Sequence, residues 1–161
     1  MCLKKLYFIL MIVGLGMINI SCEIQKEVIK MDVKQKEERQ GGGCVYISYD
    51  GDAEIIRIIQ TQNSISQSKI IGGPGYEGYE VWFRFIPQQE ISNEWVQKAI
   101  SKEHLFTLYN SWYVGPLYLK KYGIEIGKTY PCKLKVIKKG VCTPLIFEIE
   151  TLNRADYFEK K

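Results

Sequence analysis

The sequence predicts a mainly β protein, folded as one small antiparallel β-sandwich or partly open barrel with one short helix. Apolar and polar residues alternate along several short runs, as they do in half-buried strands. Glycine, proline, asparagine and aspartate separate those runs, and only one stretch combines a clear helix-capping residue with helical spacing. The part of the chain that carries these runs, about 115 residues, is long enough for one hydrophobic core but not for two.

The first residues predict export. Lys4 and Lys5 form a positive start, and the apolar run of residues 6–18 that follows is too short to span a membrane comfortably. The small residue Ser21 then precedes Cys22. This order is typical of a secretory signal followed by a processing site.

The segment Asn19-Ile20-Ser21-Cys22 resembles the lipobox of bacterial lipoproteins, with Asn19 at the position where leucine is usual. Looser lipoboxes of this kind occur in Bacteroidota-type lipoproteins. The resemblance covers residues 1–22 only, and it implies that the thiol of Cys22 is acylated, for example with palmitate, and that Cys22 becomes the mature N-terminus. The protein is then expected in the bacterial cell envelope, lipid-anchored at the periplasmic face or the cell surface.

A charged linker follows the lipidated cysteine. Residues 23–40 hold five acidic and five basic side chains, and the three glycines at 41–43 are typical of a hinge. Ile24, Val28 and Met31 have the spacing of a short amphipathic helix, but three apolar residues bury little surface, so a solvated tether is favoured. The sequence therefore predicts a signal peptide at 1–21, a lipidated cysteine with a tether at 22–43, and a β-rich globular domain at 44–161.

The charge balance argues against a nucleic-acid partner. The whole chain has a formal net charge of +4, and loss of Lys4 and Lys5 with the signal peptide leaves +2. A nucleic-acid-binding protein needs a concentrated basic face, which a nearly neutral chain does not favour. The expected partners are instead the membrane, reached through the lipid, and an envelope protein or a glycan, with no cofactor and no metal ion.

Alternation predicts strands in the first half of the domain. Residues 45–49 form one, and Asp50-Gly51-Asp52 supplies turn chemistry after it. Residues 53–61 are rich in isoleucine and fit either a strand or a helix that begins at Asp52. A further strand is predicted at 79–86, with one face formed by Tyr79, Val81, Phe83 and Phe85.

The clearest helix begins at Ser92-Asn93-Glu94, where asparagine is a good capping residue. Its spacing predicts that Trp95, Ala99 and Ile100 face inward. Residues 62–68 are polar and predict a connection. Residues 117–122, which follow a glycine-proline break, fit one helical turn or a strand.

The best-specified hairpin lies near the C-terminus. A two-residue turn at Lys139-Gly140 predicts that Leu134 pairs with Leu145 and Cys132 with Phe147. The apolar face of this hairpin consists of Tyr130, Cys132, Leu134, Val136, Leu145, Phe147 and Ile149. The opposite face is predicted to be solvated, with Lys133 and Lys135 near Glu148 and Glu150. Proline cannot donate to the ladder, so Pro144 is expected on an edge or at a bulge.

Three cysteines remain after Cys2 is removed and Cys22 is lipidated. In the predicted hairpin Cys132 faces the core and Cys142 faces water, so a bridge between them is disfavoured by geometry. Either Cys44 pairs with one of the two or all three stay reduced.

A complete G-x-G-x-x-G pattern occurs at Gly73, Gly75 and Gly78. A dinucleotide site needs such glycines between a strand and a helix, whose N-terminus meets the pyrophosphate. Here a strand is predicted to follow, at 79–86. The glycines are therefore interpreted as turn residues rather than as a nucleotide site.

Two further patterns have weak functional interpretations. Asp50, Asp52 and Glu54 alternate as calcium ligands do, but Thr61 stands where a calcium loop needs its bidentate glutamate, so a hairpin turn is favoured. His104 is the only histidine and is predicted to lie on the surface near a helix end. The third-ranked hypothesis is an envelope hydrolase in which His104 is a general base.

Aromatic residues provide the strongest functional signal. Tyrosine and tryptophan offer a large contact area with a polar tip, which suits protein interfaces and sugar stacking alike. The candidate binding residues are Tyr109, Trp112, Tyr113, Tyr76 and Tyr79. The leading hypothesis is a non-catalytic, membrane-tethered accessory lipoprotein that binds a protein partner, with no catalytic residues. The alternative is a carbohydrate-binding lipoprotein that uses the same aromatics.

Overall fold

The computed structural model describes residues 36–40 and 43–157, and it is mainly β. Cys22 and the rest of the predicted signal peptide, and most of the predicted tether, lie outside these residues. The strands are β1 (Lys36–Gln40), β2 (Cys44–Ile59), β3 (Glu80–Pro87), β4 (His104–Phe106), β5 (Thr129–Lys139) and β6 (Leu145–Ile149). The helices are α1 (Gln62–Gln67), α2 (Glu94–Ile100) and α3 (Pro116–Tyr122).

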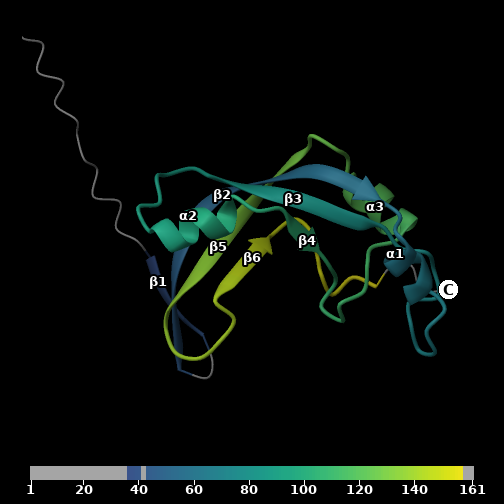
Figure 1. Cartoon of the computed structure of the whole chain (residues 1–161), viewed down its shortest axis with the longest axis horizontal. Helices are drawn as coiled ribbons and strands as arrows, with labels where there is room; N and C mark the ends of the chain where they lie inside the picture. Colours follow the sequence, from purple (N-terminus) through teal and green to yellow (C-terminus); the bar gives the residue numbers. More distant parts are fainter. Residues whose placement is uncertain (1–35, 41–42, 158–161) are drawn as a thin grey trace, which may run out of the picture. The chain divides into compact units, whose positions relative to one another are not determined.

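The strands form one antiparallel sheet in the order β4-β3-β2-β5-β6, and β1 pairs with β2 beside this path. The sheet curls into a half-barrel (Figure 1), which confirms the predicted fold class. The expected short helix is α2. Two further short helices lie in stretches where the sequence predicts a polar connection (α1) or leaves helix and strand open (α3).

Strand β2 corrects the predicted turn at Asp50-Gly51-Asp52, because the chain runs straight through it. Gly51 is buried, and a Cβ atom there would lie 2.4 Å from the ring of Phe85 and 2.5 Å from the carbonyl oxygen of Ile86. Because Gly51 has no side chain, the Phe85 ring can pack directly against the backbone of β2. Glycine is therefore used here for close packing inside a strand and not for a turn. The ambiguous segment 53–61 is consequently mostly strand.

Strand β1 lies in the segment that the sequence assigns to the tether. It pairs antiparallel with the start of β2, from Lys36 opposite Ser48 to Gln40 opposite Cys44. Glu38 contacts the Lys135 ammonium group at 3.1 Å, so β1 is also tied to β5. The folded unit thus includes residues before Cys44.

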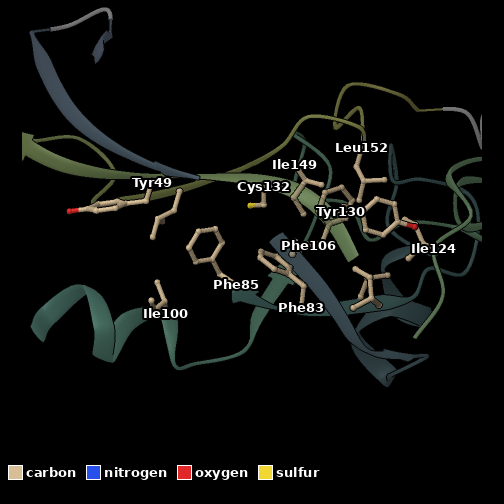
Figure 2. Close-up of a cluster of buried hydrophobic side chains, with 14 of the residues drawn as sticks. Tyr49, Phe83, Phe85, Ile100, Phe106, Ile124, Tyr130, Cys132, Ile149 and Leu152 are labelled. Carbon is tan, nitrogen blue, oxygen red and sulfur yellow. The ribbon is translucent and has the colours of Figure 1, made fainter. Parts of the chain in front are cut away.

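The core lies on the concave face of the sheet (Figure 2). Val81, Phe83 and Phe85 of β3 are all buried, as the alternation predicts. Tyr130, Cys132, Leu134 and Val136 of β5 meet them from across the sheet. The apolar faces of both predicted strands are therefore correct.

The β5–β6 pairing differs from the prediction by two residues. Leu134 pairs with Phe147 and Cys132 with Ile149, so the connection is longer than the predicted two-residue turn. Side chains keep their predicted faces because a shift by two preserves the alternation. The opposite face collects the expected ion pairs, Lys135 with Glu148 at 2.7 Å and Lys133 with Glu150 at 3.5 Å. Lys135 is nevertheless buried, at 8% exposure, so its predicted solvated position is wrong.

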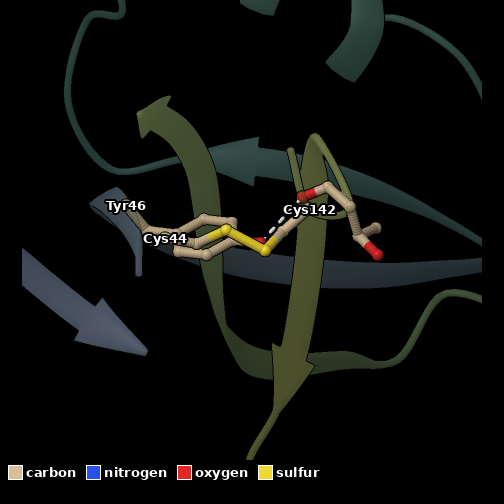
Figure 3. The surroundings of a disulfide bond; sticks show 4 residues. Cys44, Tyr46 and Cys142 are labelled. Atoms are coloured by element: carbon tan, nitrogen blue, oxygen red, sulfur yellow. Dashed lines mark hydrogen bonds between the residues drawn. A yellow bond between two sulfur atoms is a disulfide. The ribbon is translucent and has the colours of Figure 1, made fainter. Parts of the chain in front are cut away.

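A disulfide bond explains the longer connection. Cys44 and Cys142 are bonded, with their Cα atoms 6.4 Å apart (Figure 3), and Cys132 is free and buried. The hydroxyl group of Tyr46 donates to the carbonyl of Thr143 at 2.9 Å. Both contacts hold the β5–β6 connection against the start of β2. Of the cysteine pairings that the sequence leaves open, the structure has Cys44 with Cys142.

Helix α2 begins as predicted, but the face that it turns to the core is only partly the predicted one. Asn93 caps it by accepting hydrogen bonds from the backbone of Trp95 and Val96, at 3.0 and 3.3 Å. Ile100 is buried, as predicted, and so is Val96. Trp95 is 48% exposed, so its predicted inward position is wrong. Val96 and Ile100, which are four residues apart, form the buried face of α2 because both pack into the hydrophobic core, where the helix contacts β3.

Candidate functional site

The curled sheet leaves a groove between its two edge strands, β4 and β6. In the described part of the chain β4 pairs only with β3, and β6 only with β5. A cavity of about 490 Å³ lies between them. It is lined by Phe83, His104, Leu105, Phe106, Thr107, Thr143, Leu145, Ile146, Phe147, Ile149 and Arg154.

A second cavity of about 500 Å³ continues along the same strand. It is lined by Tyr109, Glu148, Glu150, Leu152 and Asn153 together with four residues of the first cavity, Ile146, Phe147, Ile149 and Arg154. Because the two cavities share these four residues, they form one continuous surface along β6, here named the β6 groove.

The inner wall of the β6 groove is aromatic. The ring centres of His104 and Phe147 lie 4.2 Å apart, and those of Phe83 and Phe147 lie 5.4 Å apart. His104 and Phe147 therefore meet on the inner face although their strands do not pair. The groove thus has an apolar inner wall beneath two strand edges.

His104 corrects its predicted surface position. The side chain is half-buried, since β4 pairs His104 with Phe83 and so directs its ring to the core face. Burial lowers the pKa of the imidazole below 6.5, a hydrogen bond to the backbone of Ala99 raises it, and the charge of Lys102 lowers it. The Nε2 atom is buried and has no hydrogen-bond partner among the described residues.

The backbone of β6 presents hydrogen-bonding groups to the groove. The N–H group of Ile137 donates to the carbonyl of Pro144 at 3.0 Å. Hydrogen-bonded pairs alternate along an antiparallel ladder, so the backbone groups of Ile146 and Glu148 point toward β5. Those of Leu145 and Phe147 point away from β5, into the groove.

The opposite wall shows the same alternation. The N–H group of Gln88 donates to the carbonyl of Asp50 at 3.0 Å, which fixes the groups of β3 that point toward β2. Phe83 then exchanges hydrogen bonds with His104. The backbone N–H and C=O groups of Leu105 consequently point away from β3 toward the groove.

Of the five predicted aromatic residues, Tyr109 alone lines the groove. Its side chain is 69% exposed, and the guanidinium carbon of Arg154 lies 5.0 Å from its ring centre. The backbone N–H group of Tyr109 donates to the carbonyl of Arg154 at 3.0 Å. Arg154 also donates from Nε to the carbonyl of Thr107 at 2.7 Å, which places the guanidinium just beyond the C-terminal end of β4.

The other four predicted aromatics are half-buried and make internal contacts. Tyr76 donates from its hydroxyl group to the carbonyl of Tyr113 at 3.0 Å, and the backbone of Tyr79 donates to Val114 at 2.8 Å. Trp112 packs against the core. These contacts bring the glycine-rich loop and the 109–114 segment together without forming one exposed aromatic surface.

The glycine pattern joins α1 to β3, so no helix follows it. Gly75 has a positive φ of 72°, a conformation that favours glycine. A Cβ atom on Gly78 would lie 2.6 Å from Cβ of Tyr113, so its small size permits close packing. Gly75 thus matches the turn interpretation, whereas Gly78 is explained by packing.

Cys142, Cys132 and Ser101 are each bonded or buried within the fold. Cys142 is in the disulfide. The pKa of the Cys132 thiol is raised to about 12, mainly by burial and to a smaller extent by the charges of Asp52 and Glu148. Ser101 donates its hydroxyl group to Lys98 at 2.9 Å. Within residues 36–40 and 43–157, no group of three histidine, cysteine, aspartate or glutamate side chains is arranged to hold a metal ion.

None of the helices in the described ranges has the length and apolar character needed to cross a membrane.

Comparison with known proteins adds no relative: no protein-family model matches the chain, and no curated protein or solved structure matches it either. By its fold, the described part of the chain belongs to the class of small, incompletely closed antiparallel β-barrels, with a groove between the edge strands β4 and β6. Leu105, Phe147 and Arg154 line the groove but are not among the site residues that the sequence predicts. The apolar alternation of 145–149 marks a strand, but no local pattern indicates that this strand is an edge.

Proposed function

We propose that this protein is a non-catalytic accessory lipoprotein of the bacterial cell envelope, which binds a protein partner through the β6 groove. The observation that carries the proposal is the groove itself, with an aromatic inner wall, unpaired strand edges and an exposed tyrosine at its rim. Edge strands with free backbone groups are recurrent sites of protein recognition.

A protein partner fits the groove better than a sugar does. Sugar stacking needs an exposed aromatic face, and Tyr109 is the exposed member of the predicted set. The guanidinium group of Arg154 lies over the Tyr109 ring and covers one of its faces. A rim that combines tyrosine and arginine is instead typical of protein interfaces.

The disulfide supports an envelope location. Such bonds persist in oxidising compartments and are rare in the bacterial cytoplasm. Cys44–Cys142 joins residues 98 positions apart, so it constrains most of the domain. It agrees with the export signal and with the lipid anchor proposed at Cys22.

Site-specific photo-crosslinking of the full lipidated chain in its native cells tests the proposed function. A photoreactive phenylalanine derivative replaces Tyr109 or Ile146 in the groove, and Glu125, an exposed residue that lines neither cavity, is the matched control position. We expect one dominant protein adduct from both groove positions and none from position 125. Equal adducts at all three positions, or none at the groove, would contradict the proposal.

A further inference from the structure

We infer that the partner occupies the β6 groove as an extended peptide strand, which pairs antiparallel with β6 and extends the sheet. The inference rests on the proposed function, because it specifies the partner's conformation at the same groove. Four features of the groove support an added strand: the direction of β4 and β6, their free backbone groups, the side chains that point inward, and the charge of Arg154.

Strand direction favours a single added strand. All neighbours along the path β4-β3-β2-β5-β6 are antiparallel, so β4 and β6 run in the same direction. Direct closure of the barrel between them would require a parallel pair. One strand placed between them can be antiparallel to both and complete an all-antiparallel ring.

The backbone groups that such a strand needs are in place. Leu145 and Phe147 direct their N–H and C=O groups into the groove, and no hydrogen bond from another described residue is found for these groups. Leu105 does the same from the β4 side. In strand addition these main-chain groups supply affinity, while pockets for alternate side chains supply specificity.

Side-chain alternation specifies the apolar face of the peptide. Residues directly opposite each other in an antiparallel pair point to the same face of the sheet. The peptide residue opposite Phe147 therefore points inward, toward the rings of Phe83 and His104. Apolar residues are expected at this position and at alternate positions, and polar residues between them.

Charge specifies one further residue. None of the ion pairs among the described residues involves Arg154. The two glutamates that line the groove contact lysines, Glu148 with Lys135 and Glu150 with Lys133. The side chain of Arg154 lines both cavities and lies beside Thr107, just beyond the C-terminal end of β4, which runs in the same direction as β6. An antiparallel peptide has its N-terminal half at that end, so an acidic residue is expected there.

The test begins with a displayed library of short random peptides, selected on the full lipidated chain in detergent micelles. We expect selected peptides to alternate apolar and polar residues and to carry an acidic residue in the N-terminal half. The selected peptide is then made with N-methyl groups on every second backbone amide, in two forms shifted by one residue. Methylation of the inward-facing residues removes the donors to Leu145 and Phe147 of β6 and should weaken binding roughly tenfold or more. The shifted form keeps these donors, loses only the donor to Leu105 of β4, and should therefore bind more tightly than the first form.

A charge pair provides the second measurement. Arg154→Gln should weaken binding of the acidic peptide several-fold and leave binding of its asparagine or glutamine counterpart unchanged. Equal loss with both peptides would contradict a charge contact between Arg154 and the acidic residue of the peptide. Equal effects of the two N-methyl forms, or no selected peptide, would overturn strand addition.

The outcomes separate this inference from the proposed function. Photo-crosslinking from the groove together with insensitivity to N-methylation would retain a protein partner and reject the added strand. Absence of both crosslinking and peptide binding would reject both proposals. Concentration-dependent dimers whose formation is blocked by the selected peptide, with crosslinks only to the same chain, would identify a second copy as the occupant and overturn the inference.

Discussion

His104 makes the stability of the protein depend on pH. Burial lowers the pKa of its imidazole below 6.5, so the unfolded chain takes up this proton at a higher pH than the folded chain. The contribution of neutral His104 to the stability of the fold is therefore complete at pH values above the pKa of the unfolded chain, about 6.5, and it declines as the pH falls below that pKa. Because the sequence contains one histidine, urea denaturation between about pH 8 and about pH 5 isolates its effect. The decline between about pH 6.5 and about pH 5 should be smaller in His104→Gln, and an identical decline would refute this assignment.

Single residues also mark the limit of what the sequence predicts. Alternation correctly places Val81, Phe83 and Phe85 on the core face, since it extends over a long strand. His104 and Trp95 are misplaced because β4 has three residues and α2 has seven. Elements this short show too few repeats for periodicity to fix a face, and tertiary packing decides it instead.

At the scale of elements, Gly51 sets the distance between β2 and the Phe85 ring. A Cβ atom would lie 2.4 Å from the nearest Phe85 carbon, which is far inside contact distance. Gly51→Ala should therefore lower the free energy of unfolding by roughly 1–3 kcal/mol through overpacking. Urea denaturation measures this loss. Partial recovery in Gly51→Ala combined with Phe85→Leu is the expected control, and an unchanged midpoint in Gly51→Ala alone would contradict the close approach.

The disulfide should contribute strongly to stability. A loop closed across 98 residues restricts the unfolded chain, so Cys44→Ser with Cys142→Ser should lose roughly 2–5 kcal/mol of unfolding free energy. Chemical denaturation with and without reductant measures this. Cys132→Ala is the matched control, because its buried thiol is outside the bond, and it should remain sensitive to reductant. Equal stability of wild type with and without reductant would contradict the prediction.

The same bond explains why the β5–β6 pairing was only partly predictable. The alternating apolar residues determine which face each side chain takes, and these faces are correct. The loop length depends on Cys142 reaching Cys44, a contact between residues distant in sequence. Turn chemistry at Lys139-Gly140 alone cannot reveal that constraint, and the predicted pairing is therefore two residues out.

At the scale of the whole molecule, the lipid anchor is a separate prediction. Two or three acyl chains bind a bilayer firmly, because each buried methylene contributes about 0.8 kcal/mol. Cys22→Ala should therefore abolish incorporation of labelled palmitate and prevent lipoprotein processing. Metabolic labelling followed by electrophoresis measures both effects, with Cys132→Ala as the control that retains the label. Undiminished labelling of the Cys22 variant would reject the lipobox interpretation.

The groove itself could not be predicted from the sequence. The fold class follows from local alternation, and Tyr109 follows from its aromatic neighbourhood. Which strands become edges depends on how the sheet curls, and β4 is too short to be recognised as a strand. Arg154 joins the site from the C-terminal segment through its contact with Thr107, which is 47 residues away in sequence.

Residue-resolved amide hydrogen exchange of the full chain, alone and with the partner identified by crosslinking, shows whether the partner pairs with the free edge of β6. In the free chain, Leu145 and Phe147 should exchange quickly, whereas Ile146 and Glu148, which bond to β5, should exchange slowly. The partner should slow exchange at Leu145 and Phe147 roughly tenfold or more and leave α2 unchanged. Protection of Leu145 and Phe147 already in the free chain, or partner protection confined to surfaces away from β6, would contradict the account.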